Sequence, residues 1–192
     1  LKFNNIDFRL NIMTHGITDI DHEYGELIKM SKGGQTYELM MIDSLINLYG
    51  ESKKVTFLDI GSYLGYYSIF YKKFNNKAEV YSIESNPNYC KYIEKSAAEN
   101  EIDNLMVENI ALAHDNESKI FYQKKLFNKQ ALVKDKNKNL AYSELINIQN
   151  VIEFGKDIKS TTLDNFIEYK NIYPNIIKID VHASEGYLLE GS

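Results

Sequence analysis

A glycine pair and a glutamate have the types and spacing that hold an adenosine-like ligand. Gly61 and Gly65 follow an apolar run that ends at Ile60, and Glu84 follows a second apolar run, 19 positions after Gly65. A glycine at such a turn permits a positive φ and a close approach of a ligand to the main chain. A carboxylate after the second strand accepts hydrogen bonds from two ribose hydroxyls and repels a 2′-phosphate. Together these residues predict a site for an adenosine-type ligand.

These residues need two parallel strands with a helix between them. The run 55–60 is mostly apolar, which is typical of a strand buried on both faces of a parallel sheet. A helical pattern continues to about Phe74, and residues 78–83 form the second strand-like run. The stretch 55–86 therefore predicts a β-α-β unit with a glycine turn after its first strand.

The number of glycines narrows the choice of ligand. A dinucleotide site with the pattern G-x-G-x-x-G packs three glycines around a pyrophosphate. Here the pattern is Asp59-x-Gly61-x-x-x-Gly65, and the bulky Tyr63 lies two positions after the first glycine. There is less room for a pyrophosphate and more for a small group that is uncharged or cationic. A nucleotide-cofactor oxidoreductase is therefore the weaker interpretation of this unit.

Three stretches resemble the sequence signatures of one enzyme family. Residues 59–65 resemble motif I of the class I S-adenosylmethionine (SAM)-dependent methyltransferases. Residues 161–166, Thr-Thr-Leu-Asp-Asn-Phe, and 177–185, Ile-Lys-Ile-Asp-Val-His-Ala-Ser-Glu, resemble the TTLDxF and IKIDVEGAE signatures of the FkbM family. That family methylates hydroxyl groups, often on sugars or glycan-like natural products. The resemblance runs from about Tyr37 to Gly191, which is most of the chain.

The resemblance implies an α/β fold with a Rossmann-like, doubly wound and mostly parallel sheet. We expect a single SAM-dependent methyltransferase domain over residues 1–192. Within it, residues 1–50 form an N-terminal cap or lid and a leading helix. Residues 51–192 form the Rossmann-like core, with a lysine-rich insertion near 124–150.

The fourth strand of the core is expected at 176–181. It should lie beside the strand at 55–60, at the reversal of strand order that creates the ligand crevice of such sheets. The chain stops at Ser192, whereas the resemblance implies a fifth strand and a closing hairpin. We therefore expect a truncated C-terminus, or an oligomeric partner that covers the edge of the fourth strand.

SAM is the cofactor that the resemblance implies, with S-adenosylhomocysteine (SAH) as its product. Asn109 is a candidate neighbour of the adenine, or a plain residue at a strand end. The candidate cofactor-binding residues are Asp59, Gly61, Ser62, Tyr63, Gly65, Tyr66, Glu84, Ser85, Asn86, Asn109 and Asp180.

Three residues after the fourth strand are candidates for catalysis: Asp180, His182 and Glu185. Methyl transfer is a direct displacement, in which the protein supplies alignment and sometimes a base for a poorly acidic hydroxyl. Asp180 is the first choice to position or deprotonate the acceptor, or else it orients the cofactor's ammonium. His182 stands where the family has glutamate, and a neutral imidazole serves as a base. Glu185 either acts in catalysis or caps the next helix.

Composition excludes several other classes of protein. A net charge of −5 argues against a general nucleic-acid binder, which needs a basic surface. The sequence has no run of about 18 apolar residues, so it predicts no membrane span. The first residues lack the layout of a secretory signal, and the single cysteine, Cys90, suits a reducing compartment, so we expect a cytoplasmic location. The acidic cluster 19–23 lacks a metal-ligand spacing, and no metal is expected.

A lysine-rich stretch covers residues 124–139, between a predicted strand at 119–123 and a predicted helix at 140–148. A charge run of this kind is either a solvated surface or a mobile flap that meets an anionic acceptor, such as a phosphorylated or nucleotide-linked sugar.

A different class of function also stays open. The changed stretch 181–185 and the early end of the chain favour a non-catalytic SAM-binding or assembly module on a methyltransferase fold.

Overall fold

The computed structural model describes residues 2–3, 6–10, 39–50, 54–116, 119–124, 129–133, 151–181, 185–190 and 192. They divide into two compact units, each described by itself below. The first is Leu1–Glu108 with Pro174–Lys178, and the second is Asn109–Tyr173 with Ile179–Ser192. The single domain expected over the whole chain stays a prediction. The acidic cluster 19–23, the predicted helix 140–148 and His182 lie outside the described residues.

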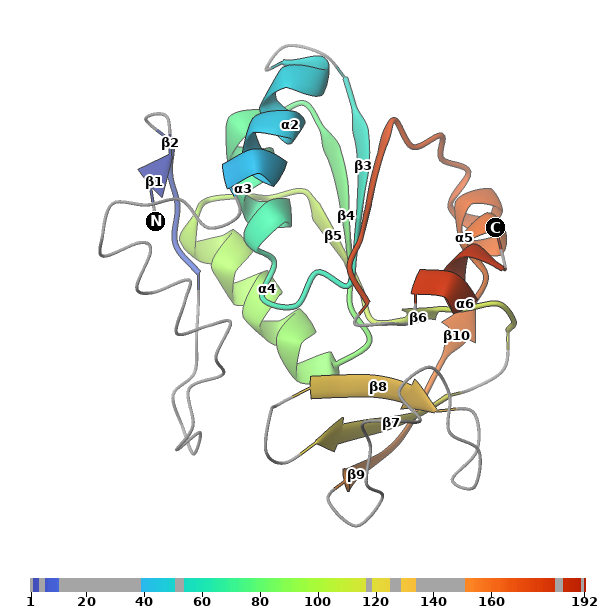
Figure 1. The fold of residues 1–192 in the computed structure, drawn as a ribbon. Coiled ribbons are helices and arrows are strands. Elements are labelled where there is room, and N and C mark those ends of the chain that lie inside the picture. The colour runs from blue at the N-terminus through green and yellow to red at the C-terminus, as the bar shows by residue number, and fades with distance from the viewer. Residues whose placement is uncertain are drawn as a thin grey trace. The chain divides into compact units, whose positions relative to one another are not determined.

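The first unit is built on a four-stranded sheet in the order β11-β3-β4-β5 (Figure 1). The strands are β3 (Thr56–Ile60), β4 (Glu79–Ile83), β5 (Leu105–Glu108) and β11 (Ile176–Ile179). β3 pairs with β4 in parallel, and β4 pairs with β5 in parallel. β11, which comes last in the sequence, lies beside β3, the first of these four strands in the sequence, so the strand order reverses at β3 as predicted. The α/β fold with a parallel sheet is thereby confirmed.

Among the described residues of this unit, three helices accompany the sheet: α2 (Leu39–Tyr49), α3 (Tyr66–Phe74) and α4 (Pro87–Glu99). α3 contacts β4 and β5, α4 contacts β5, and α2 packs on α3. The sequence Asn86-Pro87 is typical of a helix start, and α4 begins there. The side chain of Asn86 accepts a hydrogen bond from the N–H of Asn88 at 2.9 Å, and Pro87 takes the first helical position.

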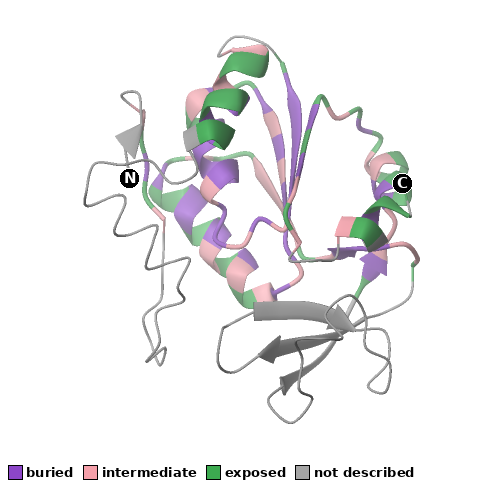
Figure 2. Ribbon diagram, viewed as in Figure 1, coloured by how far each residue is buried: buried purple, intermediate pink, exposed green. Residues whose placement is uncertain are grey.

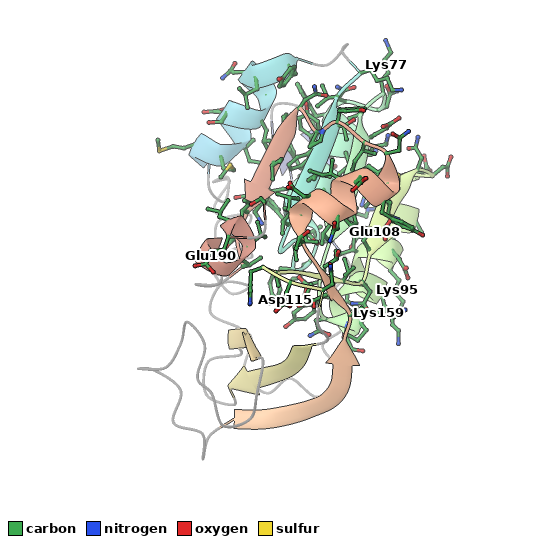
Figure 3. All side chains as sticks on the ribbon, turned by 90° about the vertical axis from the view of Figure 1, so that its right-hand side faces the viewer. Lys77, Lys95, Glu108, Asp115, Lys159 and Glu190 are labelled. Carbon is green, nitrogen blue, oxygen red and sulfur yellow. The ribbon has the colours of Figure 1, made fainter. Side chains whose placement is uncertain are left out.

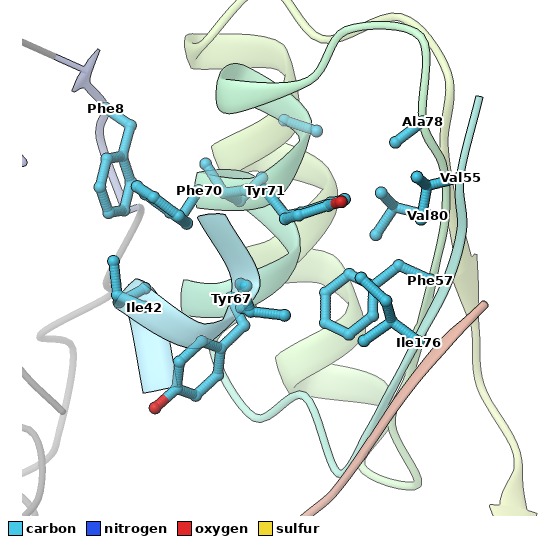
Figure 4. Close-up of a cluster of buried hydrophobic side chains, with 13 residues drawn as sticks. Phe8, Ile42, Val55, Phe57, Tyr67, Phe70, Tyr71, Ala78, Val80 and Ile176 are labelled. Atoms are coloured by element: carbon cyan, nitrogen blue, oxygen red, sulfur yellow. The ribbon is translucent and has the colours of Figure 1, made fainter. Parts of the chain in front are cut away.

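The apolar faces of these elements form one core (Figure 4). All five residues of β3 are buried, as a strand with neighbours on both sides requires (Figure 2). The rings of Phe57 and Tyr71 meet edge to face at 5.2 Å. Phe8 joins the same core, with its ring 5.9 Å from that of Phe70. Phe8 directly follows a short antiparallel pair of strands, β1 (Lys2–Phe3) and β2 (Ile6–Asp7). Charged side chains such as Lys77 and Lys95 lie on the outside (Figure 3).

The described part of the second unit contains two short sheets. β6 (Ala111–Leu112) pairs in parallel with β10 (Ser160–Thr161). β7 (Lys119–Lys124), β8 (Lys129–Val133) and β9 (Val151–Ile158) form an antiparallel sheet in the order β8-β7-β9. The strand predicted at 119–123 is thus confirmed. Within the lysine-rich stretch, residues 129–133 form a strand that pairs with β7, where the sequence indicated a solvated surface or a flap.

The helices α5 (Leu163–Lys170) and α6 (Glu185–Leu189) also belong to the second unit. Residues 160–162 are typical of a cap and predict a helix over 163–170, and α5 has these bounds. The hydroxyl of Thr162 accepts from the N–H of Asn165 at 3.1 Å and caps the first turn. Asp164 in that turn complements the helix dipole.

Candidate cofactor site

The loop 61–65 joins β3 to α3, and it is fixed to the end of β4. Gly61 and Ser62 donate their N–H groups to the carbonyl of Ile83, at 2.9 and 3.1 Å. The hydroxyl of Ser62 donates to the same carbonyl at 3.3 Å. Gly61 has φ 72°, which confirms the positive φ predicted for this turn. The first half of the loop is therefore held against the last residue of β4.

The second half of the loop is held by a side chain and by the loop itself. Tyr63 has φ 53°, an uncommon conformation for a residue with a side chain. Its N–H donates to Oε2 of Glu84 at 2.9 Å, and its ring meets that of Tyr89 edge to face at 4.7 Å. Gly65 donates its N–H to the carbonyl of Ser62 at 2.7 Å. Four N–H groups of this short loop, those of Gly61, Ser62, Tyr63 and Gly65, are thus donated within the chain.

Glu84 lies directly after β4 and is almost fully buried, at 6% exposure. Its Oε1 accepts from the N–H of Asn86 at 2.7 Å and from the hydroxyl of Ser85 at 3.4 Å. The main chain on both sides therefore holds the carboxylate in one orientation. The two oxygens of a carboxylate together accept about four hydrogen bonds, so this arrangement is compatible with ribose hydroxyls, which would displace the long contact from Ser85.

The burial of Glu84 predicts a pH dependence of stability. Desolvation raises the pKa of Glu84 above its ordinary value of 4.5. The hydrogen bonds from Asn86 and Tyr63, the positive charge of Lys178 and the hydrogen bond from Ser85 lower the pKa, but by less than desolvation raises it. The folded protein then keeps a proton that the unfolded chain releases. The contribution of Glu84 is therefore fully present below pH 4.5 and is lost as pH rises toward the raised pKa.

Glu84→Gln does not titrate and isolates this effect. Urea unfolding across the acidic and neutral range should show that the free energy of unfolding of the wild type, minus that of the variant, falls as pH rises above the ordinary pKa. A difference that stays constant, or that rises with pH, would contradict the raised pKa of Glu84.

Asp59 is fully buried on β3 beneath the loop. Its Oδ2 accepts from the N–H and the hydroxyl of Ser68 in α3, at 3.1 and 2.6 Å. The hydroxyl of Ser68 also lies 3.0 Å from that of Ser82 in β4. Oδ1 of Asp59 is 3.2 Å from the ammonium of Lys178. These contacts place Asp59 in the support of the loop, and its direct contact with a cofactor stays a prediction.

Lys178 was not among the residues that the sequence pattern singled out. It lies in β11, and its Nζ donates to the carbonyl of Gly61 at 3.0 Å. A signal was present in the sequence. One lysine interrupts the apolar run of β11, one aspartate interrupts that of β3, and these strands were expected to be neighbours. Two lone opposite charges on adjacent buried strands predict an ion pair, because a buried charge needs a partner.

Gly65 closes the loop against α4, and this predicts a measurable cost for a methyl group. A Cβ on Gly65 would lie 3.0 Å from both Cγ1 and Cγ2 of Ile93, and its φ is 76°. Gly50 has a similar φ of 67° with no atom within 4 Å, so it is a matched control. In urea unfolding, Gly50→Ala should cost about 1–2 kcal/mol for the backbone alone. Gly65→Ala should cost about 1–3 kcal/mol more. Equal costs would show that Ile93 moves aside freely.

The other candidate residues fall into three groups. Tyr66 packs into the core, with its ring 5.7 Å from that of Phe8. Asn109 and Asp180 belong to the second unit, where both are exposed and Asp180 directly follows β11. Oε1 of Glu185 accepts from the N–H of Val181 at 3.0 Å, which favours its interpretation as a cap. The remaining candidates for cofactor binding all belong to the first unit: Asp59, Gly61, Ser62, Tyr63, Gly65, Tyr66, Glu84, Ser85 and Asn86.

The geometry of the loop fits the adenosine half of SAM. Four of the five N–H groups in loop 61–65 are donated to Ile83, Glu84 and Ser62, an arrangement that suits a ligand without phosphates. The carboxylate of Glu84 lies beside the loop, with an orientation set by the main chain. Among the described residues, no group of three or more His, Cys, Asp or Glu side chains is placed to hold a metal ion. None of the described helices is long and apolar enough to cross a membrane.

The chain is similar to a solved structure of precorrin-6y C5,15-methyltransferase from Geobacter metallireducens GS-15, with 19% identity and a TM-score of 0.32. That similarity covers 38% of this chain and 37% of the other. No curated protein matches the chain. The sequence model of the methyltransferase FkbM domain matches residues 59–191, starting at the aspartate of β3. The chain belongs to the FkbM methyltransferase family.

Proposed function

We propose that this chain binds SAM at the loop of the first unit and transfers its methyl group to a hydroxyl of a sugar, glycan or glycosylated natural product. The acceptor is a small molecule or glycan. The lysine-rich stretch favours one that carries negative charge. A cytoplasmic location is part of the proposal, supported by the single cysteine.

One observation carries the choice of cofactor. The N–H groups of Gly61, Ser62, Tyr63 and Gly65 are all donated within the chain. A pyrophosphate bound at such a loop needs main-chain N–H groups that point at its oxygens. SAM has no phosphate, and its ribose needs an acceptor such as the carboxylate of Glu84. The loop therefore favours SAM over a dinucleotide.

The residues of the chain then have separate roles in the reaction. When bound, SAM supplies a methyl group activated by the positive charge on its sulfur. Glu84 accepts hydrogen bonds from the ribose, and the loop fixes where the adenosine half lies. The carboxylate of Asp180 receives the proton that the acceptor hydroxyl loses as its oxygen bonds to the methyl carbon.

A non-catalytic SAM-binding or assembly module is the second candidate function. The contact between Glu185 and the N–H of Val181 favours this function, because Glu185 then caps a helix and does not take part in catalysis. In that case the loop would bind SAM, and no acceptor would be methylated.

Thermal unfolding with SAM, SAH, NAD or no ligand tests the proposal. A ligand at 100 times its Kd stabilises a protein by about 2.7 kcal/mol, which raises the Tm of a domain this size by about 5–10 °C. We expect a shift with SAM and with SAH and none with NAD. A shift with NAD alone would contradict the proposal. Binding of SAM without transfer of labelled methyl groups to any glycan pool would favour the module.

A further inference from the structure

The first unit buries an ion pair that stability alone does not explain. The side chains of Lys178 and Asp59 are 6% and 0% exposed, and their charged atoms lie 3.2 Å apart. Moving two charges out of water costs several kcal/mol per ion, and apolar replacements of a buried pair are often neutral or stabilising. The pair is therefore better explained by what each side chain holds in place.

Lys178 holds the start of the loop. Besides facing Asp59, its Nζ donates to the carbonyl of Gly61 at 3.0 Å and lies 5.3 Å from the centre of the Tyr67 ring. The N–H of Gly61 is bonded to Ile83. Both polar groups of this glycine are thus fixed from two different strands, β11 and β4. A glycine has no side chain to restrict its backbone, so these contacts determine its conformation.

Asp59 holds the other end of the loop. Its Oδ2 binds the N–H and hydroxyl of Ser68, the third residue of α3. The N–H groups of a helix's first turn have no partner inside the helix. Asp59 supplies one, and so sets the position of α3 relative to β3. The ion pair therefore secures the loop at its first residue and at the helix that follows.

The charge of the pair also bears on the ligand. SAM carries a positive charge on sulfur, and SAH lacks it. An unpaired ammonium beneath the loop would repel SAM, because two charges interact over many ångströms in a protein interior. Asp59 neutralises that ammonium at 3.2 Å. The charge of Lys178 also reaches Glu84, where it lowers the pKa against the effect of burial.

We propose that Lys178 is a positioning residue of the cofactor site, which holds the carbonyl of Gly61, and that Asp59 cancels its charge so that the loop accepts a sulfonium cofactor. This inference rests on the proposed function, because it assigns the loop to SAM. It adds a residue to the site and a reason for the ion pair beneath it.

Calorimetric titration of SAM and SAH into three variants tests this inference. Lys178→Met should weaken SAH about tenfold, because Gly61 loses its donor. The affinity for SAM should fall less, because the carboxylate of Asp59 is then unpaired and attracts the positively charged sulfur. Asp59→Asn leaves the opposite charge, so it should weaken SAM at least about threefold more than SAH. The double variant Lys178→Met/Asp59→Asn should bind SAH about tenfold more weakly than wild type, with the wild-type ratio of SAM to SAH affinity. A purely structural role would lower both affinities by one factor in every variant.

An exposed ion pair in the same sheet provides matched controls. Lys54 and Glu79 lie 3.3 Å apart with 78% and 42% of their side chains exposed, near the ends of β3 and β4 that are remote from the loop. Lys54→Met and Glu79→Gln make the same changes in charge. Both should keep the wild-type affinities and their ratio.

Hydrogen exchange of the loop in the ligand-free protein separates this inference from the proposed function. The N–H groups of Gly61, Ser62 and Tyr63 should exchange about tenfold faster in the double variant than in the wild type. The double variant removes both charges of the buried pair and leaves neither one without a partner, so it answers the question even if the single variants do not fold. Wild-type SAH affinity and loop exchange in the folded double variant would overturn the inference, and so would equal losses of SAM and SAH in Asp59→Asn. A wild type that binds neither ligand would overturn the proposed function, and the exchange rates would still report on Lys178.

Discussion

Replacing Asp180 with asparagine is expected to lower the rate of methyl transfer by about 10²–10⁴-fold, while SAM affinity changes by less than about twofold. An amide cannot receive the proton that the acceptor hydroxyl loses. The measurement is the transfer of a labelled methyl group from SAM to a pool of sugars and glycans, with SAM affinity followed by calorimetry. Asp103→Asn, at an exposed position before β5, is the control and should leave both unchanged.

Two other results would assign Asp180 differently. Normal turnover in Asp180→Asn would exclude it as the base and leave His182 or Glu185 as the catalytic candidates. Loss of SAM binding would place Asp180 at the cofactor's ammonium, the alternative that the sequence left open.

Glu84→Ala should weaken SAH binding by about 10–100-fold, which corresponds to about 1.4–2.8 kcal/mol. The variant loses the acceptor for the ribose hydroxyls. It also releases the N–H of Tyr63, whose φ of 53° is held partly by that contact. Calorimetry on the folded variant measures the change. Glu94→Ala, at an exposed position on α4, is the control and should bind as the wild type does. Unchanged affinity in Glu84→Ala would remove Glu84 from the site.

Features of the fold that depend on neighbouring residues could be predicted well. Helix α5 begins after a threonine cap and ends at Lys170 as expected, because capping is decided within four residues. The proline at the start of α4 and the positive φ of Gly61 are local in the same sense. The position of β11 beside β3 followed from the topology of parallel sheets, in which the order of strands reverses at the ligand site.

Features that depend on distant partners could not be predicted. The glycine pattern shows that the loop turns, but it does not show that Ile83 and Glu84 accept its N–H groups. Tyr63 has a positive φ, which a tyrosine seldom adopts, so the residue type at this position predicts a different backbone conformation. The strand β8 lies in a stretch where six lysines indicated solvent, and its pairing with β7 decides its structure.

The ion pair beneath the loop has a consequence for the order of folding. Ser68 and Ser82, which share a hydrogen-bond network with Asp59, follow it within 23 positions, whereas Lys178 follows it by 119. Contacts between residues so far apart in the chain form late, because a long loop must close first. While the chain emerges from the ribosome, the carboxylate of Asp59 stays hydrated until β11 has been synthesised and packs beside β3. In pulsed hydrogen exchange, the loop N–H groups should become protected together with β11 and later than those of α3. The cofactor loop is then among the last parts of the first unit to mature, and a nascent chain that still lacks β11 should not capture SAM.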